Sequence, residues 1–260
     1  MKIICILLLP VLVIACNNTA DSPKTTSAGS TANATAEPIN AGPCNKMIFF
    51  QKGAEVEATS YNAEGKEVSK QLTKILDVRN ENGITIADVE GIDRMSNGEE
   101  KPPMHYSYNC DGNKIYFDIA TMFRSEKKDG DIGFKSSTIE YPINIKEGET
   151  LPDVTGVMSS EKNGKTSEMK YHFKDRKVSV KEEVTTAAGT WNCYKISNTV
   201  EVDLDIPGMD ENSKRIMKEM QSKTKNETIT WFSPAFGIVK MEMYLNGKLT
   251  SRNEVTAFKK

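Results

Sequence analysis

Few side chains in this sequence are suited to acid–base catalysis or to metal binding, and those few lie far apart. Its two histidines, His105 and His172, each fall in a stretch that reads as a β-strand, beside aromatic residues and without a neighbouring cysteine or histidine. Adjacent carboxylates such as Glu182-Glu183 point to opposite sides of a strand, so they cannot act together as general acid and base. The sequence has no nucleophile elbow and no phosphate-binding glycine loop. These observations predict a protein that is not an enzyme and binds no cofactor.

A calcium-loop pattern begins at Asp203 and fails at two positions. Asp203 and Asp205 have the spacing of the first two ligands of such a loop. The fifth position is Pro207, which offers no side-chain oxygen, and the twelfth is Lys214, whose positive charge stands where a bidentate glutamate is needed. We therefore predict no metal site.

The chemistry best defined by the sequence is that of Cys16. It closes Val13-Ile14-Ala15-Cys16 after Lys2 and an apolar run too short to span a bilayer, a pattern that resembles a bacterial lipobox. We expect residues 1–15 to be a signal peptide and Cys16 to carry a lipid that tethers the protein to a membrane. Asn17 takes the place of the aspartate that retains lipoproteins in the inner membrane. The expected location is therefore the cell envelope, at the outer membrane, with the periplasmic or surface face left open.

Three further cysteines, Cys44, Cys110 and Cys193, lie in the part of the chain expected to fold. An oxidising envelope permits a disulfide, and an odd count leaves at least one free thiol. We favour Cys44–Cys110, because Cys44 opens the folded region, where the incoming chain needs fixing, and Cys110 lies at a strand end. Cys193 lies in an apolar strand, so we expect a buried, unreactive thiol there.

Composition divides the mature chain into a tether and a domain. Residues 16–43 are rich in Asn, Thr, Ser, Ala and Gly and contain almost nothing large and apolar, which predicts a flexible tether. Residues 44–260 are predicted to form a single β-rich domain. The 34 basic and 36 acidic residues are interleaved along the chain and give a net charge of −2. Because no basic face is evident, we expect no nucleic-acid partner.

From residue 54 onward, turn residues interrupt the chain at strand-length intervals. Asn82-Gly83 and Asn246-Gly247 each separate two strand-like stretches in the manner of a two-residue hairpin. Lys174-Asp175-Arg176 reads as a further break between two strands. With little helix between the strands, the pattern predicts a mainly β fold with a single antiparallel, strongly curved sheet and one or two short helices.

The two predicted helices cover residues 118–124 and 210–221. The second follows Asp210, a favourable N-cap residue, and places Ile216, Met217 and Met220 on one side. Neither is long enough to be stable alone, so we expect each to pack on the sheet. The second helix has two interpretations: a peripheral cover of the core, or a movable lid over an apolar groove, since methionine adapts to variable contacts.

Several motifs in a fixed order resemble the TapB-like lipoproteins of Bacteroidota. They are Pro43-Cys44, YNAEGK at 61–66, YNCDG at 108–112, GETLPD at 148–153, TTAAGTWNCYKI at 185–196 and WFSPAFGIVK at 231–240. The resemblance implies a curved half-barrel sheet akin to the lipoprotein carriers (LolA/LolB-like), and it implies no catalytic residues. The segment 203–226 is longer than the corresponding connection, so a feature special to this chain is expected there.

Aromatic residues in these motifs either add apolar area to the core or line a pocket. The candidate groove and lid residues are Trp191, Tyr194, Trp231, Phe236, Ile216, Met217 and Met220. We expect a lipid-anchored, non-enzymatic envelope protein that binds an apolar ligand or a protein segment on its curved sheet. The alternative is a structural or accessory protein of an envelope assembly that binds no small ligand.

Overall fold

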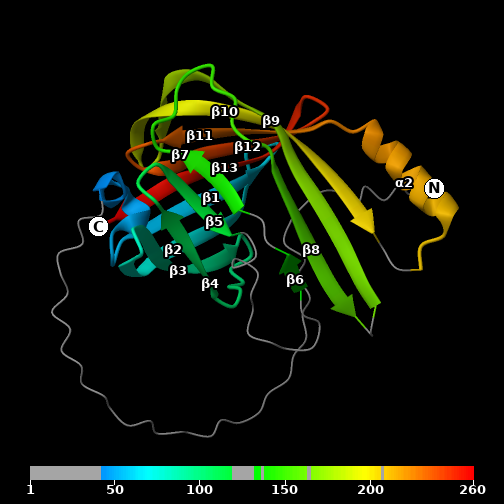
Figure 1. The fold of residues 1–260 in the computed structure, drawn as a ribbon, viewed down its shortest axis with the longest axis horizontal. Coiled ribbons are helices and arrows are strands. Elements are labelled where there is room, and N and C mark those ends of the chain that lie inside the picture. Colours follow the sequence, from blue (N-terminus) through cyan, green and yellow to red (C-terminus); the bar gives the residue numbers. More distant parts are fainter. Residues whose placement is uncertain (1–41, 119–131, 136–137, 163–164, 206–207) are drawn as a thin grey trace, which may run out of the picture. The chain divides into compact units, whose positions relative to one another are not determined.

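Long strands joined by short turns make up most of the chain that the computed structural model describes, which comprises residues 42–118, 132–135, 138–162, 165–205 and 208–260. The first seven strands are β1 (Glu55–Asn62), β2 (Glu67–Glu81), β3 (Ile84–Met95), β4 (Met104–Cys110), β5 (Lys114–Asp118), β6 (Ile132–Lys135) and β7 (Thr138–Pro142). The other six are β8 (Val154–Lys162), β9 (Lys165–Thr186), β10 (Gly189–Asp205), β11 (Asn226–Ser233), β12 (Gly237–Leu245) and β13 (Lys248–Lys259). Two 3-10 helices, η1 (Gly42–Lys46) and η2 (Ile48–Phe50), precede β1, and the α-helix α2 (Glu211–Ser222) joins β10 to β11 (Figure 1).

These strands form one antiparallel sheet in the order β6-β8-β9-β10-β11-β12-β13-β1-β2-β3-β4-β5-β7. The sheet curls until it is nearly closed into a barrel, and the edge strand β7 comes next to β8 (Figure 1). The predicted fold class, a single, strongly curved antiparallel sheet, is therefore confirmed. Its curvature exceeds that of the half-barrel that the resemblance implied.

Two of the predicted hairpins are confirmed in detail. Asn82 and Gly83 have φ angles of 51° and 83°, and Asn246 and Gly247 have φ angles of 50° and 74°. Two successive residues with positive φ form the mirror-image turn whose twist matches that of the strands it connects, and Asn-Gly is the preferred pair for it. Both turns accordingly join directly paired strands, β2 to β3 and β12 to β13.

The predicted break at Lys174-Asp175-Arg176 is wrong, because β9 continues through it from Lys165 to Thr186. Asp175 has a φ of 55°, and the pairing of β9 with β10 shifts register between residues 197 and 199 of β10. The local signal is therefore that of a β-bulge, in which one strand carries an extra residue, and not of a hairpin. Bulges bend a strand and change the direction of a side chain, which here is that of Arg176.

The core lies within the curve of the sheet and includes the segment that precedes β1. The most deeply buried large side chains include Met47, Ile48, Ile75, Ile196 and Phe232, each at most 2% exposed. η2 packs against β2 and β3. Residues 38–260 form one compact unit.

Two sequence predictions fall wholly or mostly outside the described residues: the signal peptide with its tether, and the helix at 118–124. Asp118 ends β5, and 119–124 are not described. In the part of the chain that is described, no helix has the length and apolar character needed to cross a membrane.

Candidate interaction surface

In the described part of the chain the histidines and the calcium-like segment form no metal-binding cluster, although His172 stands opposite Glu201, two residues before Asp203. His105 of β4 is exposed, whereas His172 of β9 is half-buried, and its Nδ1 lies 3.0 Å from the hydroxyl of Thr155 in a hydrogen bond. Asp203 is exposed, and Pro207 lies outside the described residues. Within the described ranges, no group of three or more His, Cys, Asp and Glu side chains is placed to hold a metal ion.

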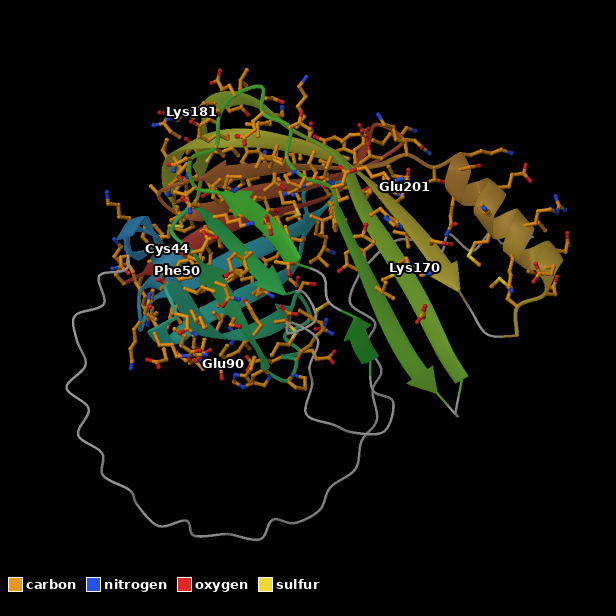
Figure 2. The ribbon with its side chains drawn as sticks, viewed as in Figure 1. Cys44, Phe50, Glu90, Lys170, Lys181 and Glu201 are labelled. Atoms are coloured by element: carbon orange, nitrogen blue, oxygen red, sulfur yellow. A yellow bond between two sulfur atoms is a disulfide. The ribbon has the colours of Figure 1, made fainter. Side chains whose placement is uncertain are left out.

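Cys44 and Cys110 are joined by a disulfide, with their Cα atoms 6.1 Å apart, and both are buried. This is the pair that the sequence analysis favours. The bond connects η1 to the end of β4, so it fixes the segment before β1 to the sheet (Cys44 is labelled in Figure 2). Closing a loop between residues 66 positions apart stabilises the fold by about 4 kcal/mol in the chain-entropy description.

The third cysteine, Cys193 of β10, is a free and fully buried thiol. Burial, together with the negative charge of Glu182, raises the pKa of this thiol to about 12. The nucleophilic form of cysteine is the thiolate, so the surroundings of Cys193 suppress its reactivity.

Two of the four candidate groove aromatics, Trp191 and Phe236, pack directly against each other with ring centroids 5.1 Å apart. Phe236 also contacts Phe258 at 5.4 Å and Phe49, from η2, at 5.9 Å. Tyr194 packs against the same core. Trp191 and Phe236 therefore pack within the fold beside Phe49, whereas Phe258 remains 41% exposed.

The fourth aromatic, Trp231 of β11, has polar neighbours. Its indole N–H donates to Glu182 at 2.5 Å, and the ammonium groups of Lys240 and Lys195 lie 4.5 Å and 5.5 Å from its ring centroid. Lys240 also pairs with Glu242, whose side chain is only 12% exposed. Trp231 is thus held between charged side chains of three neighbouring strands.

The helix α2 differs from its expected packing, since none of its residues is buried. It begins as predicted: the Asp210 carboxylate accepts a hydrogen bond from the backbone N–H of Ser213 at 3.0 Å. Two of its apolar residues remain open to solvent, Ile216 at 45% and Met220 at 66% exposed, while Met217 is partly buried. The helix contacts β10 and stands beside the end of that strand, so it does not cover the sheet (Figure 1).

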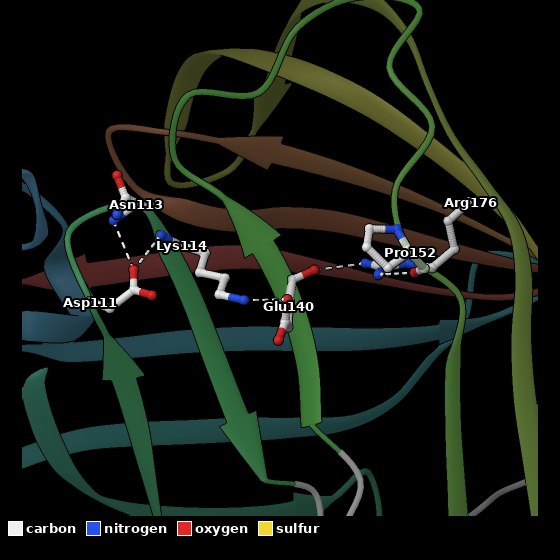
Figure 3. Close-up of polar contacts among 6 residues, drawn as sticks. All are labelled: Asp111, Asn113, Lys114, Glu140, Pro152 and Arg176. Carbon is white, nitrogen blue, oxygen red and sulfur yellow. Dashed lines mark hydrogen bonds and ion pairs between the residues drawn. The ribbon is translucent and has the colours of Figure 1, made fainter.

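Arg176 is a structurally important residue that the sequence analysis missed. It is 3% exposed, and its guanidinium donates to the backbone carbonyl oxygens of Pro152 at 2.9 Å and Glu140 at 2.8 Å (Figure 3). The guanidinium also lies 5.6 Å from the ring centroid of Tyr141. Burial lowers the pKa of the Arg176 guanidinium, whereas Tyr141, Glu140 and Asp153 act to raise it. Arg176 thereby connects β9 to the edge strand β7, where the barrel nearly closes. The sequence signal that could have located the bulge before Arg176 was Asp175, a residue type that tolerates the positive φ found there.

Beyond the barrel, β9 and β10 continue as a pair after β11 has ended. We use the term extension for β6, β8, residues 165–174 of β9 and residues 199–205 of β10. Its apolar face consists of Val154, Met169, Tyr171, Phe173, Val200 and Val202. The opposite face is polar and includes Lys170 and Glu201 (Figure 2).

The apolar face of the extension is separate from the main core. In register, Phe173 stands between Val154 and Val200, and Tyr171 stands beside Val202. None of the six residues belongs to the core cluster or packs against it. Val154 and Tyr171 are each 7% exposed, and the other four are partly exposed.

One edge of the extension has no paired strand among the described residues, and α2 contacts β10 and stands on this side of it (Figure 1). β10 pairs with β11 only as far as Val200, which stands opposite Asn226, whereas its pairing with β9 continues to Asp205. Among the described residues, no strand pairs with the other side of 201–205. This segment therefore presents backbone N–H and C=O groups next to the apolar face.

Comparison with known proteins assigns the chain to a family. Residues 51–255, from before β1 into β13, match the DUF3108-like family. The chain belongs to the DUF3108-like family. No curated protein matches it. The narrower resemblance to TapB-like lipoproteins stays a prediction.

Solved structures similar to this DUF3108-like chain share its fold. One is a predicted lipoprotein of Parabacteroides distasonis, with 19% identity, a TM-score of 0.62, and coverage of 82% of this chain and 99% of that one. Another is a predicted exported protein of Bacteroides fragilis with a YmcC-like fold, with 21% identity, a TM-score of 0.58, and coverage of 82% and 100%. At such identities the likeness establishes the fold alone.

Proposed function

We propose that this protein is a lipid-anchored, non-enzymatic component of the bacterial cell envelope, at the outer membrane, that binds an extended apolar segment of another protein along the unpaired edge of β10. The envelope location is supported by the lipobox-like sequence ending at Cys16 and by the Cys44–Cys110 disulfide, which suits an oxidising compartment. Neighbours of the same fold that are described as a lipoprotein and an exported protein also support it.

The observation that carries the proposed binding mode is the one-sided pairing of residues 201–205. An added strand gains affinity from backbone hydrogen bonds along such an edge and specificity from alternate side chains. Here the alternate side chains on one face would meet Val200 and Val202, and those on the other would meet Glu201 and Asp203. The fitting partner therefore alternates apolar residues with basic or polar ones.

The packing of the barrel favours this edge over the enclosed space as the binding site. Side chains from η2 and from both halves of the sheet, among them Phe50, Val89, Ile196 and Phe232, form one buried cluster there. An apolar ligand inside the curve would have to displace them.

A photo-crosslinking amino acid at position 202, in the full chain in its native membranes, tests the proposal. The control carries the crosslinker at Val180, an exposed residue of β9 within the barrel part (53% exposed). We expect position 202 to capture a protein at a peptide with alternating apolar residues, and position 180 not to capture it. The synthetic peptide should then bind the native chain and lose affinity for Val202→Lys, because a lysine on an edge strand opposes strand addition.

Two results would contradict the proposal. Equal capture at positions 180 and 202 would mean that the edge has no special role. Exclusive crosslinking of position 202 to lipid would assign the apolar face to an acyl chain and not to a protein segment.

A further inference from the structure

The helix α2 carries an apolar stripe that the fold leaves open. Ile216, Met217 and Met220 lie on one side of it, since residues four apart share a face and successive residues turn by about 100°. Ile216 and Met220 are 45% and 66% exposed, and no residue of the helix is buried. A helix of twelve residues is marginal without packing on its apolar side, so the stripe is suited to a surface outside this chain.

The charge of α2 is opposite in sign to that of the whole protein. With both of its caps, Asp210 and Lys223, the helix has four basic residues, Lys214, Arg215, Lys218 and Lys223, and three acidic ones, which gives 4 − 3 = +1. The whole chain has a net charge of −2. The local charge therefore selects an anionic partner.

The cations are arranged around the stripe. At about 100° per residue, Lys214 and Lys223 fall on its two flanks, and Arg215 and Lys218 fall on the opposite face. Lys214 and Lys223 pair with Glu211 and Glu219 at 3.0 Å and 2.8 Å, and all four side chains are substantially exposed. Exposed pairs of this kind are weak, so both lysines can exchange a carboxylate for a phosphate. Long basic side chains at the border of an apolar stripe can extend to headgroups while their stems remain in contact with apolar surface.

We propose that α2 is an interfacial helix that lies on an anionic membrane surface, with Ile216, Met217 and Met220 at the boundary between headgroups and acyl chains and with the flanking Lys214 and Lys223 on lipid phosphates. Helices that bind in the plane of a membrane typically combine an apolar stripe with basic residues on their polar side. This contact is additional to any lipid at Cys16, and it does not depend on a partner segment at β10.

Vesicle flotation tests this proposal without any partner protein. The chain used is 16–260 with Cys16→Ser, which lacks both the expected signal peptide and the lipid. The vesicles are phosphatidylcholine alone, or equal parts of phosphatidylcholine and phosphatidylglycerol. We expect flotation with the anionic vesicles, weakening as salt is added, and little with the neutral ones.

Two paired variants separate the apolar contribution from the charge. Met217→Ser with Met220→Ser should weaken binding to anionic vesicles about tenfold or more, through lost apolar burial. Lys214→Gln with Lys223→Gln should weaken it roughly thirtyfold, because each basic residue near such a surface contributes about 1 kcal/mol. The control Val180→Ser, which removes an exposed apolar side chain from the barrel wall, should bind like the parent chain.

Three outcomes would overturn the proposal. The first is no flotation with anionic vesicles, and the second is flotation that the methionine variant leaves unchanged. The third is a dimer, seen by sedimentation without vesicles and abolished by the methionine variant, which would assign the stripe to a second copy of the chain. Each outcome leaves the proposed strand addition at β10 to be judged by its own crosslinking experiment.

Discussion

The guanidinium of Arg176 donates a hydrogen bond of 2.8 Å to the backbone carbonyl oxygen of Glu140, a residue 36 positions earlier in the chain. This bond joins the middle of β9 to the edge strand β7. The side chain of Glu140 meanwhile pairs with Lys114 of the neighbouring β5 at 2.8 Å (Figure 3). β7 is thus held by strand pairing to β5 and also by the buried guanidinium of Arg176.

Replacing Arg176 with methionine should lower the free energy of unfolding by about 2–4 kcal/mol, because two buried carbonyl groups lose a charged donor. Urea denaturation followed by circular dichroism measures the change. The matched control is Arg94→Met, whose partner Glu100 and whose own side chain are at least half exposed. That variant should change the stability by no more than about 0.5 kcal/mol. Equal effects of the two substitutions would show that Arg176 does not hold β7.

Removing the disulfide by Cys44→Ser with Cys110→Ser should destabilise the fold by about 4 kcal/mol, less any strain that is relieved. A reductant should produce a similar loss in the parent chain. Thermal or urea unfolding, with and without reductant, tests both statements. Cys193→Ala serves as the control and should keep the sensitivity to reductant. A parent chain whose unfolding midpoint is indifferent to reductant would contradict this role of the bond.

The Cys193 thiol should resist alkylation in the folded protein at about pH 8 and react at once after unfolding. Its pKa is raised from about 9 to about 12 in the folded state, which therefore holds the proton more tightly than the unfolded state. The contribution to stability is complete below about pH 9 and declines as the pH rises toward 12. Compared with Cys193→Ala, the parent chain should lose more stability over this interval. If the free energies of unfolding of the two proteins change in parallel with pH, folding does not raise the pKa of Cys193.

Gly237→Ala should destabilise the protein by about 2–3 kcal/mol, through both conformation and contact. Gly237 has a φ of 116°, and an added Cβ would approach the ring of Phe49 to 2.8 Å. Gly112→Ala is the control, since Gly112 has a φ of 89° and nothing within 4 Å of an added Cβ, so it reports the backbone cost alone, about 1 kcal/mol. In a double-mutant cycle, Phe49→Leu should relieve part of the cost at Gly237 and none at Gly112. Additive effects at both sites would exclude the steric contact.

Local sequence signals predicted the elements well where the cause is itself local. The hairpins at Asn82-Gly83 and Asn246-Gly247 follow from the tolerance of these residues for positive φ. The same kind of signal at Asp175 was assigned to a turn, because a single residue with positive φ fits a hairpin or a bulge equally well. The pairing of the flanking residues with β10 decides between them, and that pairing is not local.

The candidate site was harder to predict, because an amphipathic pattern does not say what the apolar side meets. The stripe of Ile216, Met217 and Met220 was correctly identified, yet it does not pack on the sheet as expected. Trp191 and Phe236 were named together and do touch, whereas Trp231 lies among Glu182, Lys195 and Lys240. These neighbours come from β9, β10 and β12, whose register with β11 the sequence alone left undetermined.

The sequence by itself determined the strand-rich class, the two Asn-Gly turns, the start of α2 at Asp210 and the lipobox-like motif at Cys16, since each depends on residues within a few positions of one another. Only the tertiary structure decided how far the sheet curls, where β10 runs free of β11, and that Arg176 reaches Glu140. Curvature accumulates from the twist of every strand and from each bulge, so small local differences add up around the sheet. The positions of the seam and of the extension are therefore properties of the whole sheet.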